Sequence, residues 1–230
     1  MCGRFASAKH DVDLVPELGV DRVVDDPPPL SWNVAPTQDV RVVVERRSGD
    51  GAGTERQLRS MRWGLIPSWA TDPRVGSRMI NARVETLSER PAYRNALLRR
   101  RCIVPATGYY EWWRQPDGTT IPQFLHRDED VLSFAGLYEI WRDATIDDLV
   151  WTFTLLTTKA PDELGHIHDR SPVLIPVHLR SEWLDPHPLD PAESRHLLHR
   201  LEPPALAVRT VSTAVNNHRN NGPQLAEPIG

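Results

Sequence analysis

Cysteine is scarce in this chain of 230 residues, which contains only Cys2 and Cys102. Two cysteines cannot build the multi-disulfide framework of a small secreted domain, so the composition favours a reducing, cytosolic setting. Cys102 lies in an apolar run over residues 102–106, and we expect it to be a buried small hydrophobic residue.

Long apolar runs are also lacking, and none approaches the length of a membrane span. No basic segment followed by an apolar segment opens the chain, so we expect no secretory signal and no membrane partner. Hydrophobic residues make up 40% of the chain and charged residues 25%, which are the proportions of a globular protein. We therefore expect a cytoplasmic protein, nucleoid-associated if bacterial, with one domain over residues 1–230.

Lysine is nearly absent, since Lys9 and Lys159 are the only two and arginine supplies the other basic side chains. The net charge of −4 argues against a strongly basic nucleic-acid-binding protein. Arginine is, however, better suited than lysine to form two hydrogen bonds with one phosphate group. GC-biased codon usage is the favoured explanation for most of these arginines. A local basic cleft is still compatible with a net negative charge on the whole chain.

Several motifs of nucleotide and hydrolase chemistry are missing. The chain has no glycine-rich phosphate loop and no Gly-x-Ser-x-Gly elbow. His166 and His168 have the spacing of a metal pair on a strand, but no cysteine or carboxylate set with metal-ligand spacing accompanies them. We therefore predict no metal site, and we expect no cofactor.

Strands outnumber helices in the pattern of the chain. Strands are expected over residues 40–45, 57–63, 131–141, 150–158, 172–177 and 205–211, with two more in 102–113. Helices are expected over residues 91–101 and 191–200, with weak helical spacing at 11–18 and a short turn of helix at 161–165. Residues 31–37 and 63–69 are expected to be loops, and 48–53 a flexible turn. Because most strands follow one another directly, we predict an α+β fold with a mainly antiparallel, barrel-like sheet and short peripheral helices.

The position of Cys2, directly after the initiator methionine, is unusual. Removal of Met1 would leave an α-amine with a pKa of about 8 and a thiol with a pKa of about 8.5 on one residue. Together these two groups can capture an aldehyde, because the amine forms a Schiff base and the thiol then closes a five-membered thiazolidine ring. The alternative is that Cys2 is an ordinary residue at a frayed terminus.

Three further positions carry groups suited to acid–base or binding chemistry, and each has a structural alternative. Glu111 stands between aromatic residues, either on a solvated face or in an apolar pocket that raises its pKa. His168 is either a proton-transfer group or a capped loop histidine. Residues 81–83 are either part of a site or a turn in which Arg83 pairs with Glu85.

Seven short motifs together resemble the SRAP (SOS response-associated peptidase) family of abasic-site sensors that crosslink to single-stranded DNA. They occur in the family's order and extend from the first residue nearly to the last. The motifs are residues 1–5 (MCGRF), 32–37 (WNVAPT), 63–69 (WGLIPSW), 80–86 (INARVET), 108–112 (GYYEW), 167–170 (IHDR) and 211–228. Two details differ from the family pattern: a small residue, Ser171, precedes Pro172, and Ala70 follows Trp69 where another member has a second tryptophan.

The resemblance implies the role of each site residue. Cys2 would be the nucleophile, Asn81 would hold Cys2 and the opened sugar, Glu111 would act as acid and base, and His168 would move protons at the sugar oxygen. The residues implied to contact DNA are Arg4 and Arg83 at phosphates, Pro36 and Trp69 beside bases, and Thr157 near the same site. The implied partner is single-stranded DNA that contains abasic sites, with AP-lyase activity and self-removal of Met1 as further implied activities.

Two other functions remain open from the residues alone. Cys2, His168 and either Asn81 or Glu111 could form the triad of a cysteine peptidase or of an N-terminal nucleophile hydrolase. The chain could also be a non-catalytic reader of modified nucleic acid. Formation of a covalent DNA adduct that requires Cys2 would separate these hypotheses.

Overall fold

The structure is a computed structural model that describes residues 2–48, 53–127, 131–143, 145, 147–161, 163–202 and 204–229. Its strands are β1 (Phe5–Ser7), β2 (Arg22–Val23), β3 (Ser31–Val34), β4 (Asp39–Arg47), β5 (Thr54–Trp63), β6 (Asn81–Arg83), β7 (Arg101–Ala106), β8 (Gly108–Arg114), β9 (Thr120–His126), β10 (Leu132–Asp143), β11 (Asp148–Lys159), β12 (Arg170–Pro172) and β13 (Ala207–Thr210). Its α-helices are α1 (Asp11–Leu18), α2 (Pro91–Arg99), α3 (Arg180–Leu184) and α4 (Pro191–His199). Short 3₁₀ helices are η1 (Pro73–Arg78), η2 (Val84–Thr86), η3 (Val177–Leu179), η4 (Thr213–Asn216) and η5 (Pro223–Leu225).

Five long strands close into a barrel. Strands β11, β10, β7, β4 and β5 are neighbours in that order, and a short parallel pairing of β5 with β11 completes the ring. Alternate residues point inward, as the two-residue period of a strand requires, and the interior is filled by valine, aromatic and leucine side chains from all five strands. The predicted mainly antiparallel, barrel-like sheet with short helices around it is confirmed.

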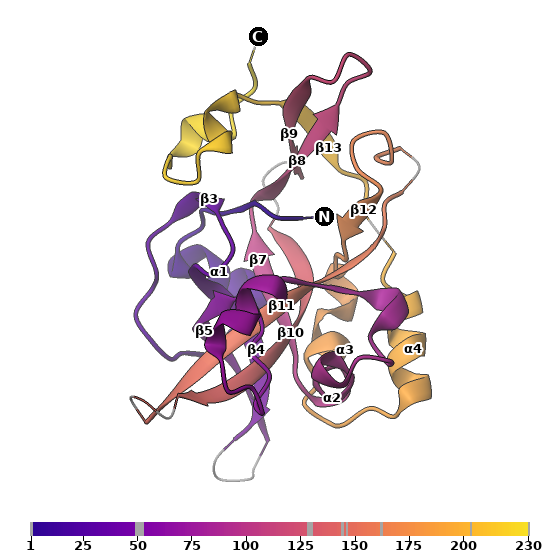
Figure 1. Cartoon of the computed structure of the whole chain (residues 1–230). Coiled ribbons are helices and arrows are strands. Elements are labelled where there is room, and N and C mark those ends of the chain that lie inside the picture. The colour runs from indigo at the N-terminus through magenta and orange to yellow at the C-terminus, as the bar shows by residue number, and fades with distance from the viewer. Residues whose placement is uncertain are drawn as a thin grey trace.

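A second sheet lies above the barrel in Figure 1, in the order β13-β9-β8-β1-β3. The C-terminal segment with η4 and η5 packs over this sheet, where it covers an aromatic cluster that includes Tyr110 and Phe124. Gly108 lets β8 approach β9 closely, because a Cβ at this position would lie 2.3 Å from the ring of Phe124. The first described residues run between the two sheets, close to β12 (Figure 1).

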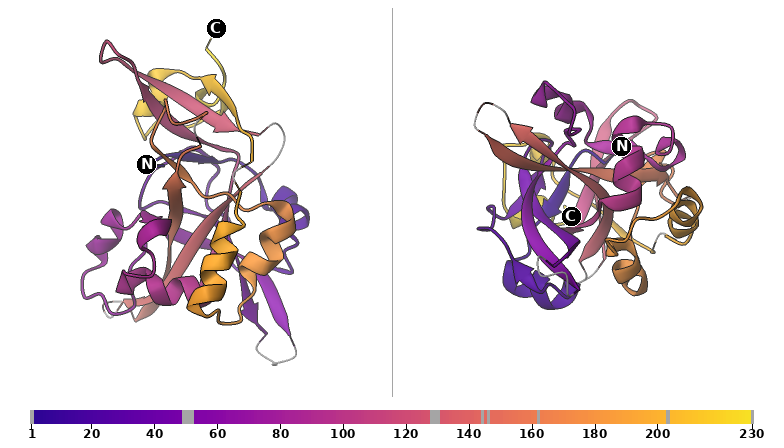
Figure 2. Two further views of the ribbon diagram at one scale, coloured as in Figure 1. Left: turned by 90° about the vertical axis from the view of Figure 1, so that its right-hand side faces the viewer. Right: turned by 90° about the horizontal axis from the view of Figure 1, so that it is seen from below.

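The helices flank the barrel and bury a separate apolar cluster against it, as the two turned views in Figure 2 also show. Helix α2 begins with Pro91, which suits the first turn of a helix. Helix α4 begins with a capping box in which Asp190 and Glu193 exchange hydrogen bonds with each other's backbone. Among the described residues, no helix is both long and apolar enough to cross a bilayer.

Three local predictions were wrong. Residues Ser31–Val34 form β3 instead of a loop, because they pair with β1 from the start of the chain. Residues 172–177 do not form one strand, because Pro172 ends β12 and Val177 begins η3. Between them Val173, Leu174 and Ile175 are buried, and Leu174 makes an isolated bridge to Phe134. The short helical turn predicted at 161–165 is a set of hydrogen-bonded turns, with Asp162 outside the described residues. The predicted turn at 48–53 also falls largely outside them.

Candidate active site

Cys2 lies just before β1, between the barrel and the upper sheet, and has no exposed surface. Burial raises the pKa of its thiol, and the nearby Glu111 carboxylate adds to this effect. The thiol is therefore held in its neutral form. The backbone carbonyl of Cys2 accepts a hydrogen bond of 2.7 Å from the Asn81 side-chain amide.

Asn81 is positioned by β6, which runs parallel to β11 with Asn81 opposite Leu155. While its Nδ2 donates to Cys2, its buried Oδ1 accepts no hydrogen bond from any described residue. A buried acceptor without a partner is costly. The asparagine thus presents an available acceptor beside the Cys2 main chain.

Glu111 lies on β8, opposite Gln123 of β9, and is 4% exposed. Burial raises the pKa of its carboxyl group to about 7. Its charge in turn contributes to the raised pKa values of Cys2 and of the buried Tyr109. A carboxyl group with this pKa can both give and take a proton near neutral pH.

His168 lies in the connection between β11 and β12 and is partly exposed. Its Nδ1 accepts a hydrogen bond of 2.9 Å from the backbone N–H of Arg170, which places the proton of the neutral ring on Nε2. Nδ1 also lies 2.9 Å from Oδ1 of Asp169, a contact that stabilises the doubly protonated ring. Burial nevertheless lowers the pKa of His168 below its ordinary value.

These contacts bring the four predicted catalytic residues into one region. Asn81 bonds to Cys2, the charge of Glu111 acts on the Cys2 thiol, and Asp169, next to His168, acts on Glu111. Their elements are far apart in the sequence, so the site forms only when the barrel and the upper sheet assemble. The described residues contain no group of three or more histidine, cysteine or acidic side chains placed to hold a metal ion.

The predicted DNA-contacting residues divide into exposed and enclosed groups. Arg83 is exposed at the end of β6, two residues after Asn81. Trp69 is 68% exposed in the loop after β5, and Trp141 supports this loop by donating to the carbonyl of Ala70. Pro36 is partly buried at the tip between β3 and β4. These three side chains are accessible to a strand of DNA.

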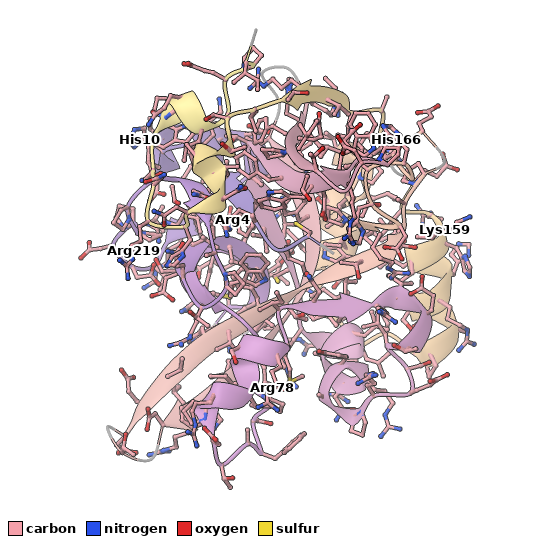
Figure 3. The ribbon with its side chains drawn as sticks, turned by 45° about the horizontal axis from the view of Figure 1, so that its top comes forward. Arg4, His10, Arg78, Lys159, His166 and Arg219 are labelled. Carbon is pink, nitrogen blue, oxygen red and sulfur yellow. The ribbon has the colours of Figure 1, made fainter. Side chains whose placement is uncertain are left out.

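Arg4 and Thr157 are less exposed than Arg83 and Trp69. One guanidinium nitrogen of Arg4 donates to Asn33 Oδ1 at 2.7 Å and to the Val215 carbonyl at 2.9 Å, and the group lies 5.8 Å from the ring centre of Trp112. Figure 3 shows Arg4 beneath the C-terminal segment. Thr157 is fully buried on β11. Both side chains contact other parts of the protein, and their roles at DNA stay predictions.

Sequence reasoning missed two residues that shape the site. Tyr109 belongs to the motif at residues 108–112 and has no predicted role, although it is buried beside Cys2 and Glu111. The side chain of Arg170 forms a bidentate ion pair with the Glu85 carboxylate, with N···O distances of 2.7 and 2.9 Å, and donates a hydrogen bond of 2.7 Å to the Thr157 carbonyl. The alternative in which Arg83 pairs with Glu85 is not what the structure shows, because Glu85 pairs with Arg170. The separation of 85 residues between the partners gave no local signal.

Comparisons with known proteins agree on the family. The family model described as SOS response associated peptidase (SRAP) matches residues 1–218. The chain is 38% identical over 229 residues to the abasic site processing protein YoqW of Bacillus subtilis (strain 168), with 99% of each chain covered. It is 30% identical over 223 residues to the abasic site processing protein HMCES of Xenopus tropicalis, which covers 86% of this chain and 66% of that protein.

A solved structure of a protein from Bacteroides thetaiotaomicron has the same fold. It superimposes with a TM-score of 0.82 at 24% identity and covers 99% of this chain and 100% of that chain. This shared fold agrees with the family match, which extends over residues 1–218. The chain belongs to the SRAP family.

Proposed function

We propose that this protein processes abasic sites by binding single-stranded DNA and forming a covalent thiazolidine crosslink through Cys2. The names of the relatives support abasic sites as the substrate. The observation that carries the proposal is the burial of Cys2 between Asn81 and Glu111, whose carboxyl pKa is about 7. The near absence of other cysteines supports a cytoplasmic, reducing setting in which the free thiol persists.

The reaction starts from the abasic sugar, a cyclic hemiacetal in equilibrium with a small fraction of open aldehyde. Doubly protonated His168, whose Nδ1 faces Asp169, gives its Nε2 proton to the ring oxygen while the Glu111 carboxylate takes the hydroxyl proton at C1′, and the aldehyde opens. Met1 must be removed first, because only then does Cys2 carry the free α-amine. The Oδ1 of Asn81 then accepts a hydrogen bond from this amine.

The amine adds to the C1′ carbonyl carbon and gives a carbinolamine. Glu111 protonates its hydroxyl group, one water leaves, and an imine forms. The thiol then adds to the imine carbon, and its proton passes to the nitrogen. The net change is formation of one C–N and one C–S bond with loss of one water.

The state of the thiol argues against the peptidase alternative. A cysteine peptidase needs a thiolate as its nucleophile. Burial raises the pKa of the Cys2 thiol in this protein, which disfavours the thiolate. A neutral thiol that acts only after the amine has formed an imine agrees with the crosslinking sequence.

The test is a time course on a denaturing gel with abasic single-stranded DNA. The wild type should give a covalent band. Cys2→Ser should form only an imine, which gives a covalent band after reduction with borohydride. Glu111→Gln should slow crosslink formation with little change in binding, and His168→Gln should slow both formation and release into competing abasic DNA. Peptide hydrolysis by the wild type without a covalent DNA band would support the peptidase instead.

A further inference from the structure

An aromatic contact joins the strand that carries Glu111 to the connection that carries His168. Trp113 follows Glu111 by two residues on β8, so both side chains point to the same face of the strand. The ring of Trp113 meets the imidazole of His166 edge to face, with centres 5.5 Å apart and planes at 89°. Edge-to-face geometry at this distance is favourable for aromatic rings.

His166 precedes His168 by two residues in the β11–β12 connection. The ends of this connection are held together by the Ala160 N–H, which donates to the Asp169 carbonyl at 2.9 Å. Inside it, the N–H groups of Ile167 and His168 donate to the Leu164 carbonyl at 2.9 and 3.3 Å. These hydrogen bonds shape the connection but do not fix its position relative to β8.

The contact lies at the outer edge of the site. His166 is exposed and Trp113 is partly buried, whereas Glu111, two residues back along β8, is buried. Figure 3 shows His166 on the flank of the molecule that also bears Lys159, at the end of β11. The pair therefore bridges β8 and the connection without closing off Glu111.

We propose that Trp113 and His166 are positioning residues that hold His168 at its working distance from Glu111. This inference rests on the proposed crosslinking function. The two proton-transfer groups act on the same sugar, so their separation must match one bound substrate. Displacement of a catalytic group by about 1 Å can cost about a hundredfold in rate.

The experiment measures single-turnover crosslinking over a range of abasic DNA concentrations for Trp113→Ala, Trp113→Phe, His166→Ala and the double alanine variant. His199→Ala, an exposed histidine on α4, is the matched control. Trp113→Ala and His166→Ala should each lower the maximum rate by about tenfold and leave the half-saturating DNA concentration within about twofold. Trp113→Phe should restore most of the rate, and the double variant should be no slower than the slower single variant.

Hydrogen exchange of the Ile167 and His168 amides, measured without DNA, tests the link separately from the reaction. Exchange at both amides should be faster in Trp113→Ala than in the wild type and normal in Trp113→Phe. The positioning role would be overturned if Trp113→Ala and His166→Ala left the maximum rate unchanged or raised only the half-saturating DNA concentration. It would also be overturned if the effects of the two single variants were additive in the double variant. If the wild type itself forms no crosslink, the proposed function fails, while unchanged amide exchange in Trp113→Ala would reject the link itself.

Discussion

Folding changes the acid–base chemistry of Glu111, because burial on β8 raises the pKa of its carboxyl group from 4.5 to about 7. Between these values the folded protein keeps a proton that the unfolded chain has already lost. The free energy of unfolding should therefore fall as the pH rises through this range and level off above about pH 7. The raised pKa that suits proton transfer thus lowers stability at neutral pH.

Glu111→Gln should remove this decrease in stability, since the glutamine side chain does not titrate in this pH range. Relative to the wild type, the variant should gain up to about 3 kcal/mol of unfolding free energy between pH 4.5 and pH 8. Urea unfolding at several pH values measures the difference, with the exposed Glu163→Gln as the control. Parallel pH profiles for Glu111→Gln and the wild type would show that burial does not perturb this carboxyl group.

Arg83 and Arg4 differ in what their guanidinium groups already contact. Arg83 is exposed, whereas Arg4 is held by Asn33 and by the Val215 carbonyl. Arg83→Gln should weaken binding to undamaged single-stranded DNA and reduce the slope of log affinity against log salt by about one phosphate contact. Arg4→Gln should leave that slope unchanged. Fluorescence anisotropy at several salt concentrations measures both slopes, and a larger loss of slope for Arg4→Gln would reverse the assignment.

At the scale of elements, local sequence pattern predicted the long strands and the two helices that begin with proline. Strands β4, β5, β10 and β11 have β-branched or alternating sequences, and α2 and α4 begin with proline, so their signals lie within each segment. The short strands β3 and β6 have only four and three residues and depend on distant partners, β1 and β11. Their local sequences could not specify them.

In the candidate site, too, local sequence predicted some features, and others depend on residues far apart in the chain. The identities of Cys2, Asn81, Glu111 and His168 came from short motifs that match the family. The contacts that hold these residues, such as Arg170 with Glu85 or Trp113 with His166, join segments far apart in the sequence. Periodicity and spacing do not report such contacts, so they required the folded structure.

Arg101, the first residue of β7, joins the helical layer to the barrel. Its buried guanidinium donates to the Trp183 carbonyl at 2.9 Å, to the Leu97 carbonyl at 3.0 Å, and to the Asp185 carbonyl. Burial lowers the pKa of this arginine to about 10, which leaves it charged at neutral pH. These bonds tie α2 and α3 to the barrel wall through one side chain.

Arg101→Met should therefore lower the free energy of unfolding by about 2–5 kcal/mol, because it leaves buried carbonyls without donors. Arg99→Met is the matched control, since Arg99 is exposed at the end of α2 and should change stability by less than about 0.5 kcal/mol. Chemical denaturation of both variants gives the comparison. Equal stabilities for the two would mean that the helices dock without Arg101.

At the scale of the whole molecule, Asn33 fastens the C-terminal segment over the upper sheet. Its Nδ2 lies 2.9, 3.1 and 3.3 Å from the carbonyls of Asn220, Asn217 and Val215, and its Oδ1 accepts from Arg4. Arg4 is two residues from Cys2, so this contact joins the C-terminal segment to the segment that carries Cys2. Figure 2 shows the C-terminal segment beside the upper sheet.

Asn33→Leu should release this segment, because no apolar side chain can replace the lost hydrogen bonds. Limited proteolysis should cut the variant within residues 213–222 faster than the wild type, and crosslinking should slow because Arg4 loses its acceptor. Asn95→Leu, an exposed change on α2, serves as the control. Cleavage of Asn33→Leu at the wild-type rate would show that other contacts hold the segment.

The central claim is that the amine and the thiol of Cys2 both bond to the opened abasic sugar. Intact mass spectrometry of the protein mixed with abasic single-stranded DNA tests it most directly. We expect protein without Met1, joined to one DNA strand with the loss of one water, in an adduct that borohydride does not change. A variant with one extra residue left in front of Cys2 should form no stable adduct. A borohydride-resistant adduct from that blocked variant, also formed with the loss of one water, or no adduct from the wild type, would contradict the account.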